Sequence, residues 1–137
     1  IYPRVWADPI YRADTEKLFL ECAERDVGVM AIKAAAWRPW GKRQPDAMSW
    51  YEPQRTKAGI ERGVKFALST PGVHCFCTSS DLHTARLAIE SASDFISLTK
   101  NEYATVTEEA RGDEIIFPLS EHAVLPRSFR SRPLGGK

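Results

Sequence analysis

The sequence is poor in net charge and in long apolar runs, and each shortage excludes a class of protein. Nineteen Lys and Arg residues stand against eighteen Asp and Glu residues, and a net charge of +1 argues against a general nucleic-acid-binding protein. The apolar runs, such as residues 27–32, are too short to cross a bilayer. Charged residues near the start, among them Arg4 and Asp8, interrupt the apolar segment of a signal peptide. We therefore expect neither nucleic acid nor membrane as a partner.

Cysteine is also scarce, with three residues at Cys22, Cys75 and Cys77. An odd and sparse set suits reduced thiols better than a disulfide framework, so we expect a cytoplasmic protein. The remaining composition, 43% hydrophobic and 27% charged over 137 residues, is typical of one folded globular domain. The first residue is Ile1 rather than Met, and we expect the chain to be a piece of a longer protein.

Apolar periodicity predicts alternating helices and strands. Asp14 is expected to cap a first helix that ends near Asp26. The expected buried face of this helix contains Leu18, Phe19 and Cys22. The continuous apolar run Val27–Ile32 is typical of a strand that is covered on both faces.

The rest of the chain repeats this alternation. The expected elements are a long aromatic connection over residues 34–55, a helix over Thr56–Leu68, a strand over Val73–Cys77, and helices over Leu82–Phe95 and Lys100–Arg111. Asp81 is placed to cap the third helix, and Thr99 with Glu102 forms a capping box for the fourth. Helices that alternate with buried strands indicate an α/β protein with parallel strands.

The number of units limits the architecture. A (β/α)8 barrel needs about 250 residues, or about 31 for each unit. The chain holds two clear βα units, a strand remnant expected at Ile1–Trp6, and a terminal helix. We therefore expect a partial TIM barrel made of the last two to three βα units, with a C-terminal helix and tail. The barrel portion is expected over residues 1–111, and an irregular basic tail over residues 112–137.

Three sequence blocks carry a family resemblance. They are GVMAIKAAAWRPWG at residues 28–41, SWYEP at residues 49–53 and IERGVKFALSTPGVHCFCTSS at residues 60–80. Together they resemble the C-terminal part of aldo/keto reductases, and most of all the bacterial "predicted oxidoreductase" branch. The stretch ALS-PGV is the most specific element. The resemblance covers residues 1–95 and fades beyond them.

The resemblance implies a TIM barrel that binds NADP(H) and reduces a small carbonyl substrate to an alcohol. In this family the catalytic Tyr, Lys, Asp and His lie on early strands, which would precede Ile1. The C-terminal part supplies much of the cofactor site. The resemblance therefore implies a cofactor-binding portion whose catalytic half lies upstream.

Several residues are candidates for cofactor binding. Lys33 follows the first strand, where it would face a pyrophosphate, and the alternative is that it extends into solvent. Hydroxyls in the turn after the second strand precede a helix N-terminus and suit a 2′-phosphate, although the turn could be an ordinary capped one. These hydroxyls belong to Thr78, Ser79 and Ser80. The family has an Arg near the position of Thr84, so Arg86 departs from the pattern by two residues. Arg38 is a further candidate for a phosphate.

Aromatic residues of the long connection are candidates for the substrate pocket. They are Trp37, Trp40, Trp50 and Tyr51. The alternative is a satellite hydrophobic cluster that fixes the loop. Cys75 and Cys77 place two thiols on one strand face, but no second ligand pair exists for zinc, so we expect no metal.

A second functional hypothesis stays open. The chain could be a non-catalytic half-barrel whose open strand edges drive self-association or weak nucleotide binding, because a fold does not determine a function.

Overall fold

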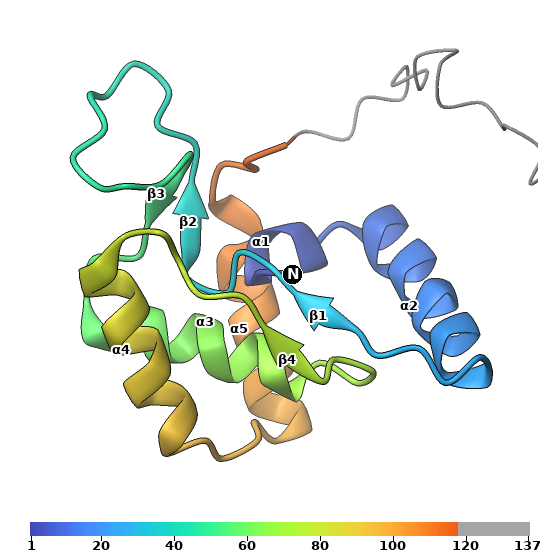
Figure 1. Cartoon of the computed structure of the whole chain (residues 1–137). Helices are drawn as coiled ribbons and strands as arrows, with labels where there is room; N and C mark the ends of the chain where they lie inside the picture. Colours follow the sequence, from blue (N-terminus) through green and yellow to red (C-terminus); the bar gives the residue numbers. More distant parts are fainter. Residues whose placement is uncertain (118–137) are drawn as a thin grey trace, which may run out of the picture.

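The computed structural model describes residues 1–117, whose elements form a mixed α/β fold (Figure 1). In chain order the elements are α1 (Pro3–Trp6), α2 (Pro9–Glu24), β1 (Met30–Ala31), β2 (Ala36–Arg38), β3 (Glu52–Pro53), α3 (Lys57–Ser69), β4 (Cys75–Phe76), α4 (Leu82–Ser93), α5 (Lys100–Glu109) and a 3-10 helix η1 (Ala110–Gly112). The strands are short and lie in two separate two-stranded sheets. The α/β class expected from the sequence is confirmed. No helix among the described residues is long and apolar enough to cross a membrane.

Strands β1 and β4 lie side by side and run in the same direction. The register pairs Met30 with Cys75. Beyond the assigned strands, the backbone N–H of Cys77 donates to the carbonyl oxygen of Ala31 at 2.9 Å, so the ladder continues toward the carboxyl end. The parallel contact between the two strands predicted from apolar runs is confirmed.

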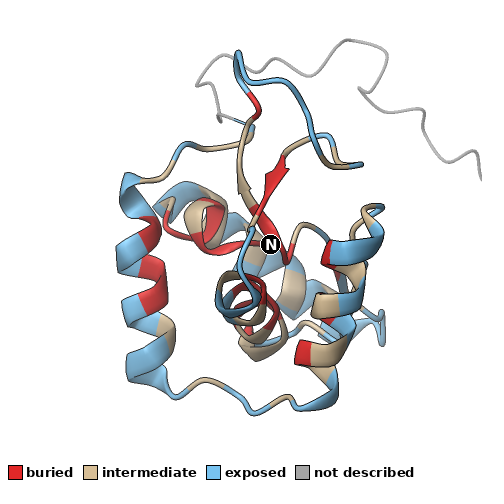
Figure 2. Ribbon diagram, turned by 90° about the vertical axis from the view of Figure 1, so that its left-hand side faces the viewer, coloured by how far each residue is buried: buried red, intermediate tan, exposed pale blue. Residues whose placement is uncertain are grey.

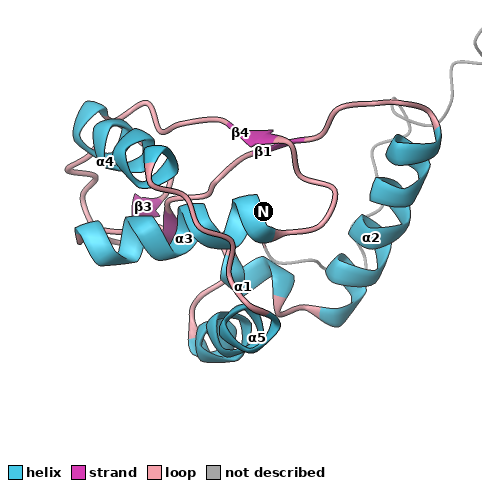
Figure 3. Cartoon of the chain, turned by 90° about the horizontal axis from the view of Figure 1, so that it is seen from below, coloured by secondary structure: helices cyan, strands magenta, loops and turns pink. Residues whose placement is uncertain are grey.

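The two faces of this sheet are covered unequally. Ala31 is 3% exposed and packs in the main core, whereas its neighbours Met30 and Ile32 are 59% and 50% exposed. Successive residues of a strand point to opposite faces, so one face is buried and the other is open. Figure 3 shows the β1–β4 pair at one margin of the molecule, with α3 on its inner side. The predicted burial of the first strand on both faces is therefore wrong, because the described helices cover only one of them.

Helix α3 is the centre of the fold, and its prediction from the sequence is confirmed. The Thr56 hydroxyl accepts a hydrogen bond from the backbone N–H of Gly59 at 3.0 Å, so Thr56 caps the helix one residue before its first turn. Ile60, Val64 and Ala67 share one face of the helix and are fully buried. Figure 2 shows buried residues gathered along the inner helices, whereas the outer helix surfaces are exposed.

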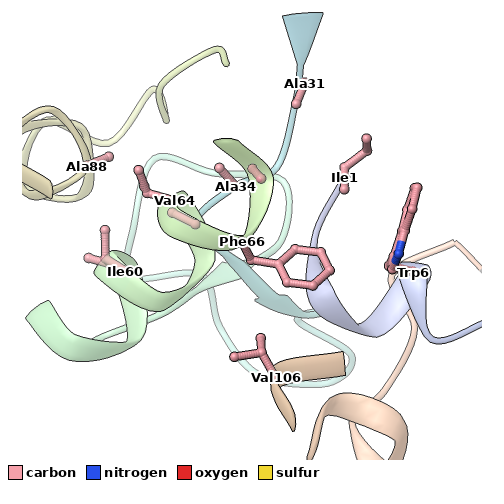
Figure 4. Packing of buried hydrophobic residues seen from close by; sticks show 11 residues of the cluster. Ile1, Trp6, Ala31, Ala34, Ile60, Val64, Phe66, Ala88 and Val106 are labelled. Carbon is pink, nitrogen blue, oxygen red and sulfur yellow. The ribbon is translucent and has the colours of Figure 1, made fainter. Parts of the chain in front are cut away.

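The core extends from α3 to α5 and α1. The Phe66 ring stacks on the Tyr103 ring with centroids 4.3 Å apart. Figure 4 shows Phe66 reaching from α3 toward Val106 and Trp6, so one side chain joins three helices. Gly63 lies against the backbone that follows β1, where an added Cβ would come within 2.1 Å of the carbonyl oxygen of Ala34. Only glycine permits this close approach of helix and strand connection.

The first helices differ from the expectation. The segment Ile1–Trp6, predicted as a strand remnant, contains the helix α1 instead, because Pro3 has the φ that a first helical turn requires. Helix α2 is capped by Asp8 rather than by Asp14. The Asp8 carboxylate accepts hydrogen bonds from two backbone N–H groups of the first turn, and Pro9 follows it at the first helical position.

Helix α2 has no fully buried residue, so its predicted apolar face is also wrong in part. Leu18 is 57% exposed, while Phe19 and Cys22 are half-buried. A Cβ added to Gly72 would come within 2.9 Å of the Phe19 ring. The Phe19 ring therefore packs directly on the turn before β4 and holds α2 against it. In Figure 3 the rest of α2 stands apart from the other helices.

The long connection contains structure that its sequence did not predict. Strands β2 and β3 form an antiparallel hairpin, in which Ala36 pairs with Pro53 and Arg38 with Glu52. The later helices agree closely with the prediction. Asp81 caps α4, which ends at Ser93 rather than at Phe95, and a complete capping box starts α5.

The segment after η1 packs on α1. The Arg4 Nε donates to the carbonyl oxygen of Asp113 at 2.6 Å, and the backbone N–H of Ile116 donates to the Tyr2 hydroxyl at 2.9 Å. The rest of the predicted basic tail, residues 118–137, lies outside the described residues.

Candidate functional site

The parallel register brings the candidate cofactor residues to one edge of the sheet. Because Met30 is paired with Cys75, Lys33 at the carboxyl end of β1 is level with Thr78 at the carboxyl end of β4. The backbone of Lys33 and the Thr78–Ser80 turn therefore follow the carboxyl ends of paired strands, where α/β proteins form their ligand sites.

Lys33 has an unusual backbone at this edge. Its φ is +68°, a left-handed conformation that costs a residue with a side chain about 1–2 kcal/mol. The ammonium lies 5.0 Å from the centroid of the Phe117 ring, as in a cation–π contact. Burial lowers the pKa of Lys33. The side chain also lines a cavity of about 160 Å3 together with apolar groups of Ile1, Val5 and Phe117, so Lys33 does not simply extend into solvent.

The Thr78–Ser80 turn leads directly into α4, and Asp81 occupies the helix N-terminus. The Ser79 hydroxyl accepts a hydrogen bond from the backbone N–H of Asp81 at 3.2 Å. The Asp81 carboxylate accepts from the backbone N–H and from the hydroxyl of Thr84, both at 2.8 Å. These hydrogen bonds from Thr84, the backbone one first, lower the pKa of Asp81. An ionised carboxylate at the helix N-terminus repels a phosphate there.

The two candidate arginines already have partners. Arg86 lies on the exposed surface of α4, where its Nε is 3.0 Å from a carboxylate oxygen of Glu90. The Arg38 Nε donates to Glu52 at 2.8 Å, and its guanidinium stacks on the Trp37 ring at 3.8 Å. A phosphate would have to compete with a carboxylate at each site.

Glu52 is the centre of an ionic cluster that the sequence analysis missed. This Glu52 cluster consists of the buried Glu52 carboxylate and the guanidinium groups of Arg38, Arg43 and Arg55. The Nε of Arg43 lies 2.9 Å from the carboxylate and that of Arg55 lies 3.9 Å from it. The hydrogen bond from Arg38, more than any other contact, lowers the pKa of Glu52. The cluster ties together the two strands and the loop of the hairpin.

The four aromatic candidates for the substrate pocket do not converge. Trp40 is buried, and its Nε1 donates to the carbonyl oxygen of Ser49 at 2.8 Å. Trp50 is 94% exposed, whereas Tyr51 is half-buried and packs near the Tyr2 cluster of α1. Trp37 lines an open cavity of about 250 Å3 beside α3. Trp40 thus fixes the hairpin, as the alternative interpretation proposed, while Trp50 contributes little to it.

A larger hollow lies elsewhere in the fold. It measures about 590 Å3 and is lined by residues of α1, α2, α5 and η1, among them Trp6, Tyr103 and Arg111. Ser69 and Pro71, which precede β4, also line it, so it opens at the amino end of that strand. In barrel proteins this end contributes to stability rather than to catalysis.

Comparison with known proteins identifies no relative: no family model, curated protein or solved structure matches the chain. Among residues 1–117, no group of three or more His, Cys, Asp or Glu side chains gathers in a way that could hold a metal ion.

Proposed function

We propose that the chain is the C-terminal, cofactor-binding part of an NADP(H)-dependent aldo/keto reductase with a partial TIM barrel. The observation that supports this most is the parallel, in-register pairing of β1 with β4 beside an open sheet face. A barrel strand has helices outside and other strands' side chains inside, so a part of a barrel leaves its inner face uncovered. The family in this proposal comes from the resemblance of the sequence blocks within residues 28–80 to aldo/keto reductases.

The residues at the strand edge fit the pyrophosphate of a dinucleotide better than they fit a 2′-phosphate. Lys33 would hold the pyrophosphate through its ammonium, and the hydroxyls of Thr78 and Ser80 would donate to it. Asp81 opposes a further phosphate at the α4 N-terminus, and the two candidate arginines would have to leave their carboxylates. Bound NADP(H) would supply the hydride for the carbonyl carbon. The chain has no residues matched to the family's catalytic tetrad.

Lys33 provides the direct test of cofactor binding. We expect NADPH to bind the chain, and Lys33→Ala to weaken the binding by roughly tenfold, or about 1–2 kcal/mol, because a charge-assisted contact is lost. Titration of NADPH fluorescence measures this. Lys17→Ala is the matched control, because Lys17 is an exposed lysine on α2. Equal affinity of both variants, or no binding by the parent chain, would contradict the proposal.

A second candidate function, self-association as a non-catalytic half-barrel, is favoured by the open sheet face. Isoleucine and methionine side chains there are half exposed, and a second copy could cover them. Sedimentation should then give a dimer that Ile32→Lys dissociates. Ile96→Lys, which alters an exposed isoleucine remote from the sheet, should leave the dimer intact. A monomeric parent chain at micromolar concentration would rule this function out.

A further inference from the structure

Three sulfur atoms lie on the open face of the β1–β4 sheet. Met30 and Cys75 are register partners in a parallel pair, so their side chains point to the same face. Cys77 lies two residues beyond Cys75 and therefore points to that face as well. All three side chains are exposed.

Two of the sulfurs approach one another across the strands. The Cys77 thiol donates to the Met30 thioether sulfur at 3.3 Å. The Met30 side chain thus reaches across from β1 to the residue that follows β4, on the same face as its register partner Cys75. Backbone hydrogen bonds between the two strands hold the three sulfur-bearing residues in place.

The two thiols are poorly placed to form a disulfide with each other. Residues two apart on a strand are separated by about 6.6 Å between Cα atoms, at the outer limit for a disulfide. Both cysteines are free thiols in the structure. They are therefore available as two separate ligands.

We propose that Met30, Cys75 and Cys77 form a binding site for a soft monovalent cation, Cu(I). Thiolate and thioether sulfurs are soft ligands that favour Cu(I), and three sulfurs suffice for a trigonal site, whereas zinc needs a fourth ligand. Binding replaces the two thiol protons: one Cu(I) adds to two thiols and one thioether, two protons are released, and no electron is transferred.

The imidazole nearest in sequence is not counted among the donors. His74 alternates with Cys75 and so points to the other face, where its Nδ1 accepts a hydrogen bond from the backbone N–H of Val29 at 3.1 Å. The site therefore consists of sulfur alone. It uses no residue of the candidate cofactor site.

The test is an anaerobic titration of the reduced chain with Cu(I) in competition with the chelator bicinchoninate. We expect one competing Cu(I) per chain. Cys75→Ser and Cys77→Ser should each abolish competition, and Met30→Leu, which keeps the side-chain volume, should weaken binding by about tenfold or more. Cys22→Ser removes a thiol remote from the sheet and should change nothing. Far-UV circular dichroism verifies that every variant is folded.

The unmutated chain supplies an independent measurement. Bound Cu(I) should slow the alkylation of Cys75 and Cys77 by iodoacetamide and leave the rate at Cys22 unchanged, as peptide mapping would show. The proposal is overturned if Met30→Leu binds Cu(I) as tightly as the parent, because the site would then be a bare thiol pair. Loss of binding in Cys22→Ser, or equal protection of all three cysteines, would indicate indiscriminate thiol binding and would also overturn it.

Discussion

The two faces of the β1–β4 sheet are built by neighbouring residues of the same strands, yet they differ in almost every respect. The inner face is aliphatic and aromatic, with Ala31 packed against a core that includes Phe66 and Val64. The outer face carries half-exposed apolar side chains and three sulfurs. The inner face thus determines the fold, whereas the outer face is left for whatever binds or covers it.

Similar substitutions on the two faces should therefore change the free energy of unfolding by different amounts. An apolar side chain stabilises the protein in proportion to the surface that it removes from water. Substitutions on the inner side should therefore reduce the free energy of unfolding, while those on the outer face should affect assembly or metal binding instead. The first experiment below pairs one position from each region, and the later ones pair a packed or ionic position with an unconstrained one.

The largest effect is expected from Phe66→Ala. Phe66 has no exposed surface and stacks on Tyr103, so its removal leaves a cavity among three helices. We expect a loss of about 3–5 kcal/mol in the free energy of unfolding, measured by urea denaturation. Ile32→Ala on the outer face should cost less than about 1 kcal/mol. Similar losses in the two variants would mean that the outer face is not open.

A backbone contact should give a smaller but clear difference. In Gly63→Ala the new Cβ meets the carbonyl oxygen of Ala34 at 2.1 Å, so helix α3 must shift from the β1 connection. We expect a loss of about 1–3 kcal/mol, as in overpacked cores. Gly28→Ala is the control, because nothing lies within 4 Å of its added Cβ. A stable Gly63→Ala protein would show that α3 is less closely packed than the structure indicates.

Local signals explain how much of the fold could be predicted from the sequence. The caps at Asp81 and Thr99 were identified because capping depends on a few adjacent residues. The first helix was predicted to begin too late, although Asp8 followed by Pro9 carried the correct signal. The burial of Val27–Ile32 could not be predicted, because a continuous apolar run contains no alternation that distinguishes an open face from a covered one.

The candidate site was predictable only in outline. The order of helices and strands was enough to bring Lys33 and the Thr78–Ser80 turn to one edge. The partners of Arg38 depend on the antiparallel hairpin, which pairs residues fourteen positions apart. The contact between Met30 and Cys77 depends likewise on strand register. Long-range pairing of this kind leaves no trace in residue spacing.

The hairpin is a third region of the molecule, and charge rather than apolar packing secures it. Arg38 holds the pKa of Glu52 below its ordinary value of 4.5, so the folded chain binds this proton less readily than the unfolded chain. The ionised cluster therefore stabilises the fold at pH values above the unfolded pKa, and that contribution is lost as the pH falls through the folded pKa.

Glu52→Gln tests this region with the smallest expected change in stability. The parent should lose more free energy of unfolding than Glu52→Gln between about pH 6 and pH 3, because the variant has no carboxylate to protonate. Urea denaturation across that range measures the difference. Glu24→Gln, at the exposed end of α2, should keep the parent's pH dependence. If Glu52→Gln also keeps it, the three arginines contribute nothing through charge, and the hairpin is secured by Trp40 and its backbone pairing alone.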